Sequence, residues 1–139
     1  MNTHTIILAA GKGTRMNTNL PKVMQPLGGM SLIEHVISTA QEISKKITVV
    51  IGHQKNLLNE HLVEINPTIV TVNQENQLGT AHAVKTASHL INDDEKVLIL
   101  YGDVPLISDK TIQLLLDSEN KCTLLSMILS DPTGYGRIV

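Results

Sequence analysis

A loop with two glycines and three nearby cations follows the first apolar run of the chain, TIILAA. The glycines are Gly11 and Gly13, and the cations are Lys12, Arg15 and Lys22. Glycine has no Cβ, so its backbone can adopt positive φ and approach a ligand closely. Successive backbone N–H groups can then point into one concavity and bind an anion, while the cations neutralise further charge. These residues predict a phosphate site suited to a nucleoside triphosphate.

The spacing of this loop differs from the two most common phosphate loops. Met16 stands where the dinucleotide fingerprint G-x-G-x-x-G needs its third glycine, and the chain also lacks the spacing G-x-x-x-x-G-K-[ST]. A hydride-transfer enzyme and a P-loop ATPase are therefore disfavoured. Pro21 has a fixed φ, which stiffens the chain before Lys22 and favours a positioned charge over an ordinary solvated lysine.

A second polar segment, QENQLGTA, follows the third apolar run and contains two primary amides, Gln74 and Gln77. Each amide can donate and accept hydrogen bonds, which suits the acceptor-donor-acceptor edge of uracil. Gly79 would let the backbone come close to a ligand, and Thr80 would begin a helix whose N-terminus favours negative charge. A polar loop before a capped helix explains the same residues equally well.

A third segment, YGDVP, places Tyr101, Gly102 and Asp103 directly after a strong apolar run. One carboxylate at the carboxyl end of a strand fits a Mg²⁺ ligand, because Mg²⁺ often takes one or two protein carboxylates and fills its shell with water and phosphate oxygens. An Asx turn is the alternative for this segment taken alone. Together with the other two segments, we interpret Asp103 as a metal ligand.

Composition limits the possible partners. The chain has 139 residues, 42% hydrophobic and 17% charged, which is typical of a globular domain with a real core. Two tyrosines, no Phe or Trp, and a net charge of −2 argue against a nucleic-acid surface. The run IILAA is too short for a signal peptide or membrane span. We expect a cytoplasmic protein that binds neither nucleic acid nor membrane.

Apolar, β-branched runs alternate with helical patterns along the chain. The pattern predicts strands over 5–10, 47–51, 68–72, 96–101 and 122–129, and helices over 32–43, 54–65, 81–90 and 110–117. Continuous apolar strands such as VLIL suit a sheet covered on both faces. The alternation predicts an α/β fold with three layers and a mostly parallel sheet. The chain ends in GRIV, which has the pattern of the apolar start of a further strand, and we therefore expect the sheet to be incomplete at the C-terminus.

Several single residues have predicted structural roles. Ser31 and Glu34 fit a capping box, and Thr80 and Ser108 are candidate N-caps. Cys122, the lone cysteine, is expected to be a buried structural thiol. The six histidines lack metal-ligand spacing, and surface or helix-capping roles are expected for all of them.

The segments LAAGKGTRM, LPKV, QENQLGTAHAV, YGDVPLI and DPTGYGRI together carry a family resemblance. The chain resembles the N-terminal uridyltransferase domain of the bacterial bifunctional N-acetylglucosamine-1-phosphate uridyltransferase / glucosamine-1-phosphate acetyltransferases. The resemblance implies a Rossmann-like nucleotidyltransferase fold and a reaction of cell-wall precursor synthesis. UTP and N-acetylglucosamine 1-phosphate would give UDP-N-acetylglucosamine and pyrophosphate, with Mg²⁺ as the cofactor.

The resemblance also assigns roles to individual residues. The backbone of the first loop would line the nucleotide, and Arg15 and Lys22 would hold its phosphates as catalytic residues. The amide segment would read uracil and its sugar, and the third segment would contact the ribose, with Asp103 binding Mg²⁺. Gly136 would touch the amino sugar. The implied substrate-binding residues are Leu8, Ala9, Ala10, Gly11, Lys22, Gln74, Gln77, Gly79, Thr80, Tyr101, Gly102, Asp103 and Gly136.

The family's pattern continues beyond the last residues of this chain. The uridyltransferase domain of the family carries later sugar ligands and a second protein ligand to the metal, followed by an acetyltransferase β-helix through which the family trimerises. We therefore expect residues 1–139 to be the N-terminal part of a domain and an impaired enzyme alone, and any homo-oligomer to form through segments outside it. Two alternatives remain open: a related nucleotidyltransferase with another substrate, and a nucleotide-binding module without turnover.

Overall fold

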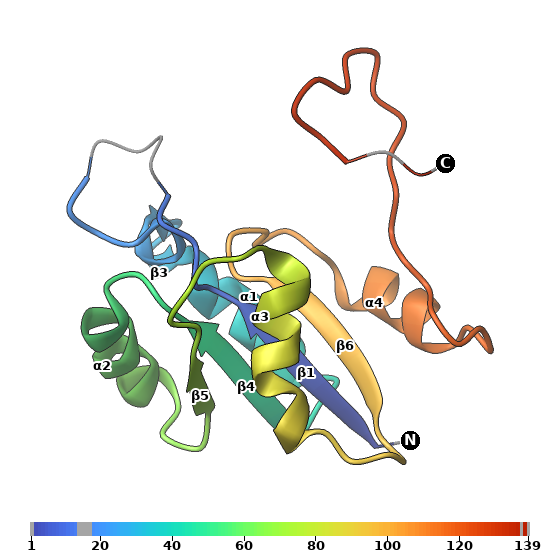
Figure 1. Cartoon of the computed structure of the whole chain (residues 1–139), viewed down its shortest axis with the longest axis horizontal. Coiled ribbons are helices and arrows are strands. Elements are labelled where there is room, and N and C mark those ends of the chain that lie inside the picture. Colours follow the sequence, from blue (N-terminus) through green and yellow to red (C-terminus); the bar gives the residue numbers. More distant parts are fainter. Residues whose placement is uncertain (1, 14–17, 137, 139) are drawn as a thin grey trace.

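A four-stranded parallel sheet forms the centre of the computed structural model, which describes residues 2–13, 18–136 and 138 (Figure 1). The strand order is β5-β4-β1-β6. The strands are β1 (Thr3–Leu8), β4 (Lys46–Ile51), β5 (Val70–Asn73) and β6 (Lys96–Tyr101). A short antiparallel pair, β2 (Pro26–Leu27) and β3 (Met30–Ser31), lies outside this sheet. The mostly parallel α/β fold is thus confirmed.

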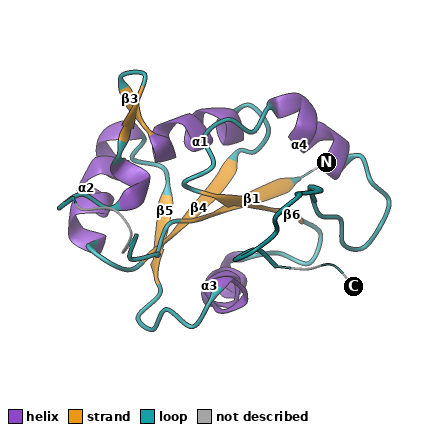
Figure 2. Cartoon of the chain, turned by 90° about the horizontal axis from the view of Figure 1, so that it is seen from above, coloured by secondary structure: helices purple, strands orange, loops and turns teal. Residues whose placement is uncertain are grey.

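Helices cover both faces of the sheet and complete three layers (Figure 2). The α-helices are α1 (Leu32–Gln41), α2 (Lys55–Ile65), α3 (Thr80–Ala87) and α4 (Asp109–Leu116), with 3-10 turns η1 (Lys22–Met24) and η2 (Ser88–Leu90). The larger core joins α1, α2 and α4 to one face through buried residues such as Ile37, Leu58 and Ile112. The smaller core joins α3 to the other face through Ala83 and Ala87.

The strand order reverses at β1. The chain adds β4 and then β5 on one side of β1, and β6 then pairs with β1 on the other side. In open parallel sheets, ligands bind outside the carboxyl ends of the strands at such a reversal. This topology brings the segments that follow β1 and β6 together, although more than 90 residues separate them in the sequence.

Two of the three predicted caps are confirmed. The Ser31 hydroxyl accepts a hydrogen bond from the backbone N–H of Glu34, whose carboxylate accepts from the N–H of Ser31, as in a capping box. The Ser108 hydroxyl accepts from the N–H of Thr111. The prediction for Thr80 is wrong by one residue: Gly79, at φ 103°, is the N-cap and Thr80 begins α3. Glycine takes this left-handed φ without strain.

The predicted fifth strand, 122–129, is not a strand in the structure. These residues are all exposed and pair with no strand among the described residues, and Figure 1 shows this part of the chain leading away from the sheet. An apolar run without a neighbouring strand has no partner for its backbone hydrogen bonds. Cys122 is therefore exposed and not the buried thiol that the sequence suggested.

Strand β6 also differs from its prediction, because only one of its faces is covered. Leu98 and Leu100 are buried, whereas Val97, Ile99 and Tyr101 are exposed. β6 is the edge strand of the sheet, and α3 contacts β1, β4 and β5 on that face. Within the described residues, no helix is long and apolar enough to cross a membrane.

His4 contradicts the expectation that every histidine has a surface or helix-capping role. Its side chain is fully buried, with Nε2 2.8 Å from the Thr48 hydroxyl and Nδ1 3.4 Å from the Glu95 carboxylate. Burial and the nearby Lys46 ammonium lower the pKa of His4 below its ordinary 6.5. A hydrogen bond from the backbone N–H of Asn92, aided by Lys46, lowers the pKa of Glu95 from 4.5 to about 2.

These two shifts predict that acid destabilises the fold in two steps. The unfolded chain protonates His4 as the pH falls below 6.5, whereas the folded chain resists, so stability is lost below that pH. Ionised Glu95 stabilises the fold above pH 4.5, and its contribution to stability disappears as the pH falls toward about 2. Urea midpoints across this range should fall in both steps, and Glu95→Gln should remove the lower one. A flat profile between about pH 7 and about pH 5 would contradict the role of His4.

Candidate functional site

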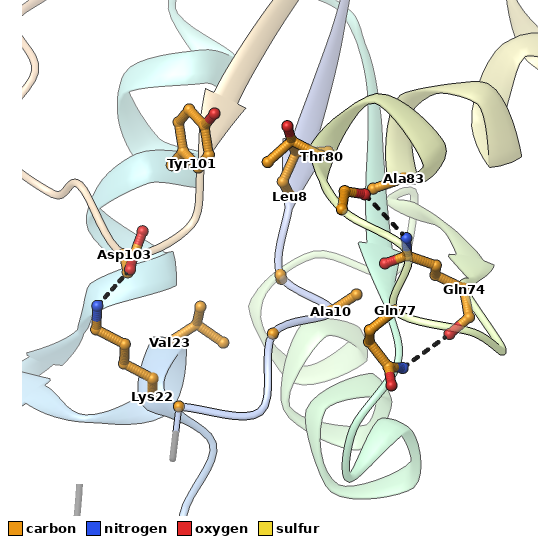
Figure 3. A pocket seen from close by; sticks show the side chains of 14 residues that line it. Leu8, Ala10, Lys22, Val23, Gln74, Gln77, Thr80, Ala83, Tyr101 and Asp103 are labelled. Carbon is orange, nitrogen blue, oxygen red and sulfur yellow. Dashed lines mark hydrogen bonds and ion pairs between the residues drawn. The ribbon is translucent and has the colours of Figure 1, made fainter. Parts of the chain in front are cut away.

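A pocket of about 450 Å³ opens at the carboxyl ends of β1 and β6 (Figure 3). This volume lies within the usual range for small-molecule sites. The pocket brings together most of the predicted site residues from all three sequence segments. Its lining consists of Leu8, Ala9, Ala10, Gly11, Gly13, Lys22, Val23, Gln74, Gln77, Gly79, Thr80, Ala83, Tyr101 and Asp103.

The loop after β1 forms the floor of this pocket. The N–H of Ala9 donates to the carbonyl of Val50 at 2.9 Å, and Ala9 and Ala10 are buried. Gly13 has a φ of +56°, and a Cβ there would lie 2.9 Å from the Cβ of Lys22. This close approach packs the loop against η1. Among the described residues, no hydrogen bond engages the N–H groups of residues 11–13.

Lys22 and Asp103 form an ion pair across the mouth of the pocket. The Lys22 ammonium donates to the Asp103 carboxylate at 2.6 Å, and both side chains are partly exposed (Figure 3). Pro21 has a φ of −50° and precedes Lys22, the first residue of η1, which is consistent with the predicted stiffening of the chain before this lysine. A cation and an anion therefore lie within reach of one bound ligand.

Gly102 lies behind the pocket and does not line it. Its N–H donates to the carbonyl of Leu8 at 2.9 Å. A Cβ at Gly102 would lie 3.2 Å from both the Leu8 carbonyl and the Val23 side chain. The absence of a side chain therefore lets the end of β6 lie close against the end of β1.

The opposite wall is formed by the two amides. Gln74 is only 3% exposed, and its Nε2 lies 3.2 Å from the Gly79 carbonyl and 2.9 Å from Nδ1 of His82. Nε2 of Gln77 donates to the backbone carbonyl of Gln74 at 3.1 Å. Both amides are therefore held in place, while Thr80 and Tyr101 are exposed at the rim.

Comparison with known proteins identifies the family. The model of the MobA-like NTP transferase domain matches residues 5–131. The chain belongs to the MobA-like NTP transferase family. The bifunctional protein GlmU of Thermotoga petrophila is 46% identical over 137 residues, which are 96% of this chain and 30% of that protein. The chain thus spans about 30% of the length of this curated relative, and the family resemblance seen in the sequence is confirmed.

Solved structures share the fold of this NTP transferase domain at low sequence identity. The Yersinia pseudotuberculosis protein HddC, in complex with GMP-PN, has a TM-score of 0.66 and 21% identity, over 83% of this chain and 55% of that one. Rv0371C of Mycobacterium tuberculosis, in complex with manganese, has a TM-score of 0.69 and 15% identity, over 84% and 59% of the two chains. The nucleotidyltransferase fold is therefore confirmed.

Besides Gly102, two predicted site residues of the NTP transferase domain are not placed in the pocket. Arg15 lies outside the described residues. Gly136 is exposed in the segment that follows α4 and is not part of the pocket lining, because this segment is not paired with the sheet. Their roles remain predictions.

Gly13, a glycine of the predicted phosphate loop, lines the pocket as well. Val23 and Ala83 contribute to the lining without having been predicted from the sequence. Gly52, just after β4, lies against both the floor and the amide wall: a Cβ there would be 2.9 Å from the Ala10 Cβ and 2.9 Å from Nε2 of Gln77. A glycine directly after a predicted parallel strand was the available signal.

Gly52→Ala is expected to disturb the floor and the amide wall of the pocket at once. The added methyl group must displace both Ala10 and Gln77, because 2.9 Å is too short for either contact. Overpacking of this kind destabilises a fold by about 1–3 kcal/mol. Thermal unfolding and nucleotide titration should both report the change, whereas Asn56→Ala, at an exposed position of α2, should alter neither. An unchanged nucleotide affinity would show that the floor and the amide wall are not coupled through Gly52.

Proposed function

We propose that the chain carries the nucleotide site of a uridylyl transferase that joins UTP to N-acetylglucosamine 1-phosphate. The observation that supports this most strongly is the pocket, in which a phosphate-type loop, the Lys22–Asp103 pair and two held amides surround one cavity. The amides provide groups suited to a uracil edge, and the loop and Lys22 provide groups suited to phosphates. Arg15 and Gly136 would add a phosphate contact and a sugar contact.

The proposed reaction needs little acid-base chemistry. A phosphate oxygen of the acceptor attacks the α-phosphorus of UTP, a new P–O bond forms, and the bond to the β-phosphate bridging oxygen breaks to release pyrophosphate. The acceptor phosphate is already ionised at neutral pH, so no general base has to remove a proton. Repulsion between two anions is the main barrier, and Lys22 and the backbone amides would lower it by positioning and charge neutralisation.

The residues present fit Mg²⁺ bound together with a nucleotide. Asp103 is the only carboxylate in the pocket lining, and no group of three or more metal-ligating side chains occurs among the described residues. This suits a metal that takes one protein carboxylate and several phosphate oxygens or waters. Asp103 would hold Mg²⁺, which would supply neutralising charge to the phosphates. The manganese complex of Rv0371C supports the use of a divalent metal.

The acceptor sugar and the cellular role are proposals drawn from the GlmU relatives. Because the chain spans only 30% of such a relative, we propose that residues 1–139 are the N-terminal part of a larger uridyltransferase domain. The exposed apolar face of β6 supports this, since an edge strand with Val97 and Ile99 exposed can accept further packing. The substrates would be cytoplasmic metabolites of cell-wall synthesis.

A nucleotide panel tests the proposed function. UTP, CTP, GTP and ATP are each titrated against the chain by calorimetry with Mg²⁺, and pyrophosphate release is then measured with N-acetylglucosamine 1-phosphate. Selective UTP binding with pyrophosphate release supports the proposal. Preference for another nucleotide would assign a related transferase, and UTP binding without release would assign a binding module. Absence of any nucleotide binding would overturn the site itself.

A further inference from the structure

We propose that His82 is a positioning residue that sets which side of the Gln74 amide faces the pocket, and thereby which pyrimidine the site accepts. This inference rests on the proposed use of a uridine nucleotide. His82 is the third residue of α3 and does not line the pocket. It acts on the ligand only through the side chain of Gln74.

The contacts of Gln74 fix the orientation of its amide. Nε2 lies 3.2 Å from the Gly79 carbonyl oxygen, which can only accept a hydrogen bond. The atom at this position must therefore be the nitrogen, because an oxygen would face another oxygen. The second N–H of the amide points to Nδ1 of His82 at 2.9 Å. Both donors of the amide are used, in a side chain that is only 3% exposed.

The state of His82 follows from this contact. Nδ1 must accept, so it carries no proton, and the proton of the neutral ring is on Nε2. The other acceptor, at Gly79, is a backbone atom that no substitution removes. Of the two groups that accept hydrogen bonds from the Gln74 amide, only His82 can therefore be removed by a side-chain substitution.

The remaining group of the amide, Oε1, is left for a ligand. Oε1 accepts no hydrogen bond from the described residues, and Figure 3 shows it directed toward the side of the pocket formed by Leu8 and Ala10. A hydrogen-bond acceptor at this position can pair with N3–H of uracil. N3 of cytosine carries no hydrogen, so its lone pair would face the lone pairs of Oε1. A flipped amide would present two donors and reverse that preference. Two contacts oppose the flip: Oε1 would face the Gly79 carbonyl oxygen, and His82 would have to move its proton from Nε2 to Nδ1 to keep its hydrogen bond.

The test compares His82→Leu with His82→Asn. Leucine removes the acceptor, whereas the Asn oxygen can take the place of Nδ1. Calorimetry with Mg²⁺ measures the affinities for UTP and CTP. We expect His82→Leu to lower the ratio of UTP to CTP affinity about tenfold, the size of one hydrogen bond. His82→Asn should restore most of the ratio. His89→Leu, an exposed histidine in η2 just after α3, should leave the ratio unchanged.

A second readout does not depend on nucleotide binding. In ¹⁵N spectra, the Gln74 side-chain amide should exchange slowly with solvent in the natural chain and in His82→Asn, and quickly in His82→Leu. A merely structural role of His82 would lower both affinities together and leave their ratio intact.

The outcomes separate this inference from the proposed function. A UTP preference that survives His82→Leu, or that His82→Asn fails to restore once lost, overturns the inference and leaves the proposed function standing. A natural chain that binds UTP and CTP equally overturns both. An amide that exchanges quickly in the natural chain overturns the inference alone.

Discussion

Asp103→Asn is expected to abolish the increase in UTP affinity that Mg²⁺ produces and to reduce nucleotidyl transfer about a thousandfold. Within the part of the chain that the structure describes, Asp103 is the only carboxylate that lines the pocket. Asparagine keeps the shape and one oxygen but loses the negative charge that a hard divalent cation prefers. A metal that neutralises transferring phosphates contributes several kcal/mol to the transition state, which corresponds to this loss in rate.

Calorimetry of UTP with and without Mg²⁺ measures the first effect directly and does not require turnover by this chain. Asp109→Asn is the matched control, because Asp109 is an exposed carboxylate in the first turn of α4 and does not line the pocket. If Asp103→Asn kept the Mg²⁺-dependent gain in affinity, the metal would have to be held elsewhere.

The elements that carry the pocket could be predicted because local chemistry and tertiary packing agree there. The apolar runs at β1, β4 and β6 are buried on at least one face, and the capping box at Ser31 satisfies the first N–H groups of α1 without help from distant residues. The carboxyl ends of parallel strands share one edge of a sheet. Segments after β1 and β6 could therefore be placed together from the sequence.

The predictions that failed depend on long-range contacts that no local pattern records. The run at 122–129 has strand composition, but a strand needs a neighbour, and none of the described strands is adjacent to it. His4 is buried because Thr48 and Glu95, far along the chain, provide polar partners. The alternating exposure of β6 arises because α3 packs over β1 and β4 and leaves the edge uncovered.

The same distinction applies within the site. Gln74 and Gln77 could be singled out by residue type and spacing, but the orientation of the Gln74 amide depends on its contact with His82, eight residues later. Lys22 and Asp103 lie in separate sequence segments, and the sequence predicted separate partners for them: phosphates for Lys22 and Mg²⁺ for Asp103. The structure pairs the two side chains at 2.6 Å, so that the proposed metal ligand and the proposed phosphate ligand bind each other before any substrate is present.

Lys22→Met is expected to change the affinities for UTP and for a metal ion in opposite directions. Because the UTP phosphates lose the Lys22 ammonium as a partner, UTP should bind about 10-fold to 100-fold more weakly, since hydrogen bonds to charged groups contribute about 1.5–3 kcal/mol. A divalent cation alone should bind a few times more tightly, because Asp103 no longer pairs with an ammonium. That gain should be small, as partly exposed ion pairs contribute only about 0.2–1 kcal/mol.

Titration of Mn²⁺ in the absence of nucleotide, followed by titration of Mg²⁺ and UTP, measures the two effects separately. Lys110→Met, which removes an exposed charge on α4, changes the net charge equally and controls for general electrostatics. Opposite signs in Lys22→Met and no change in Lys110→Met would establish that the Lys22–Asp103 pair must open before the metal and the nucleotide bind. Weaker binding of both ligands in Lys22→Met would instead mean that the lysine maintains the shape of the pocket, and that Asp103 depends on it for its position.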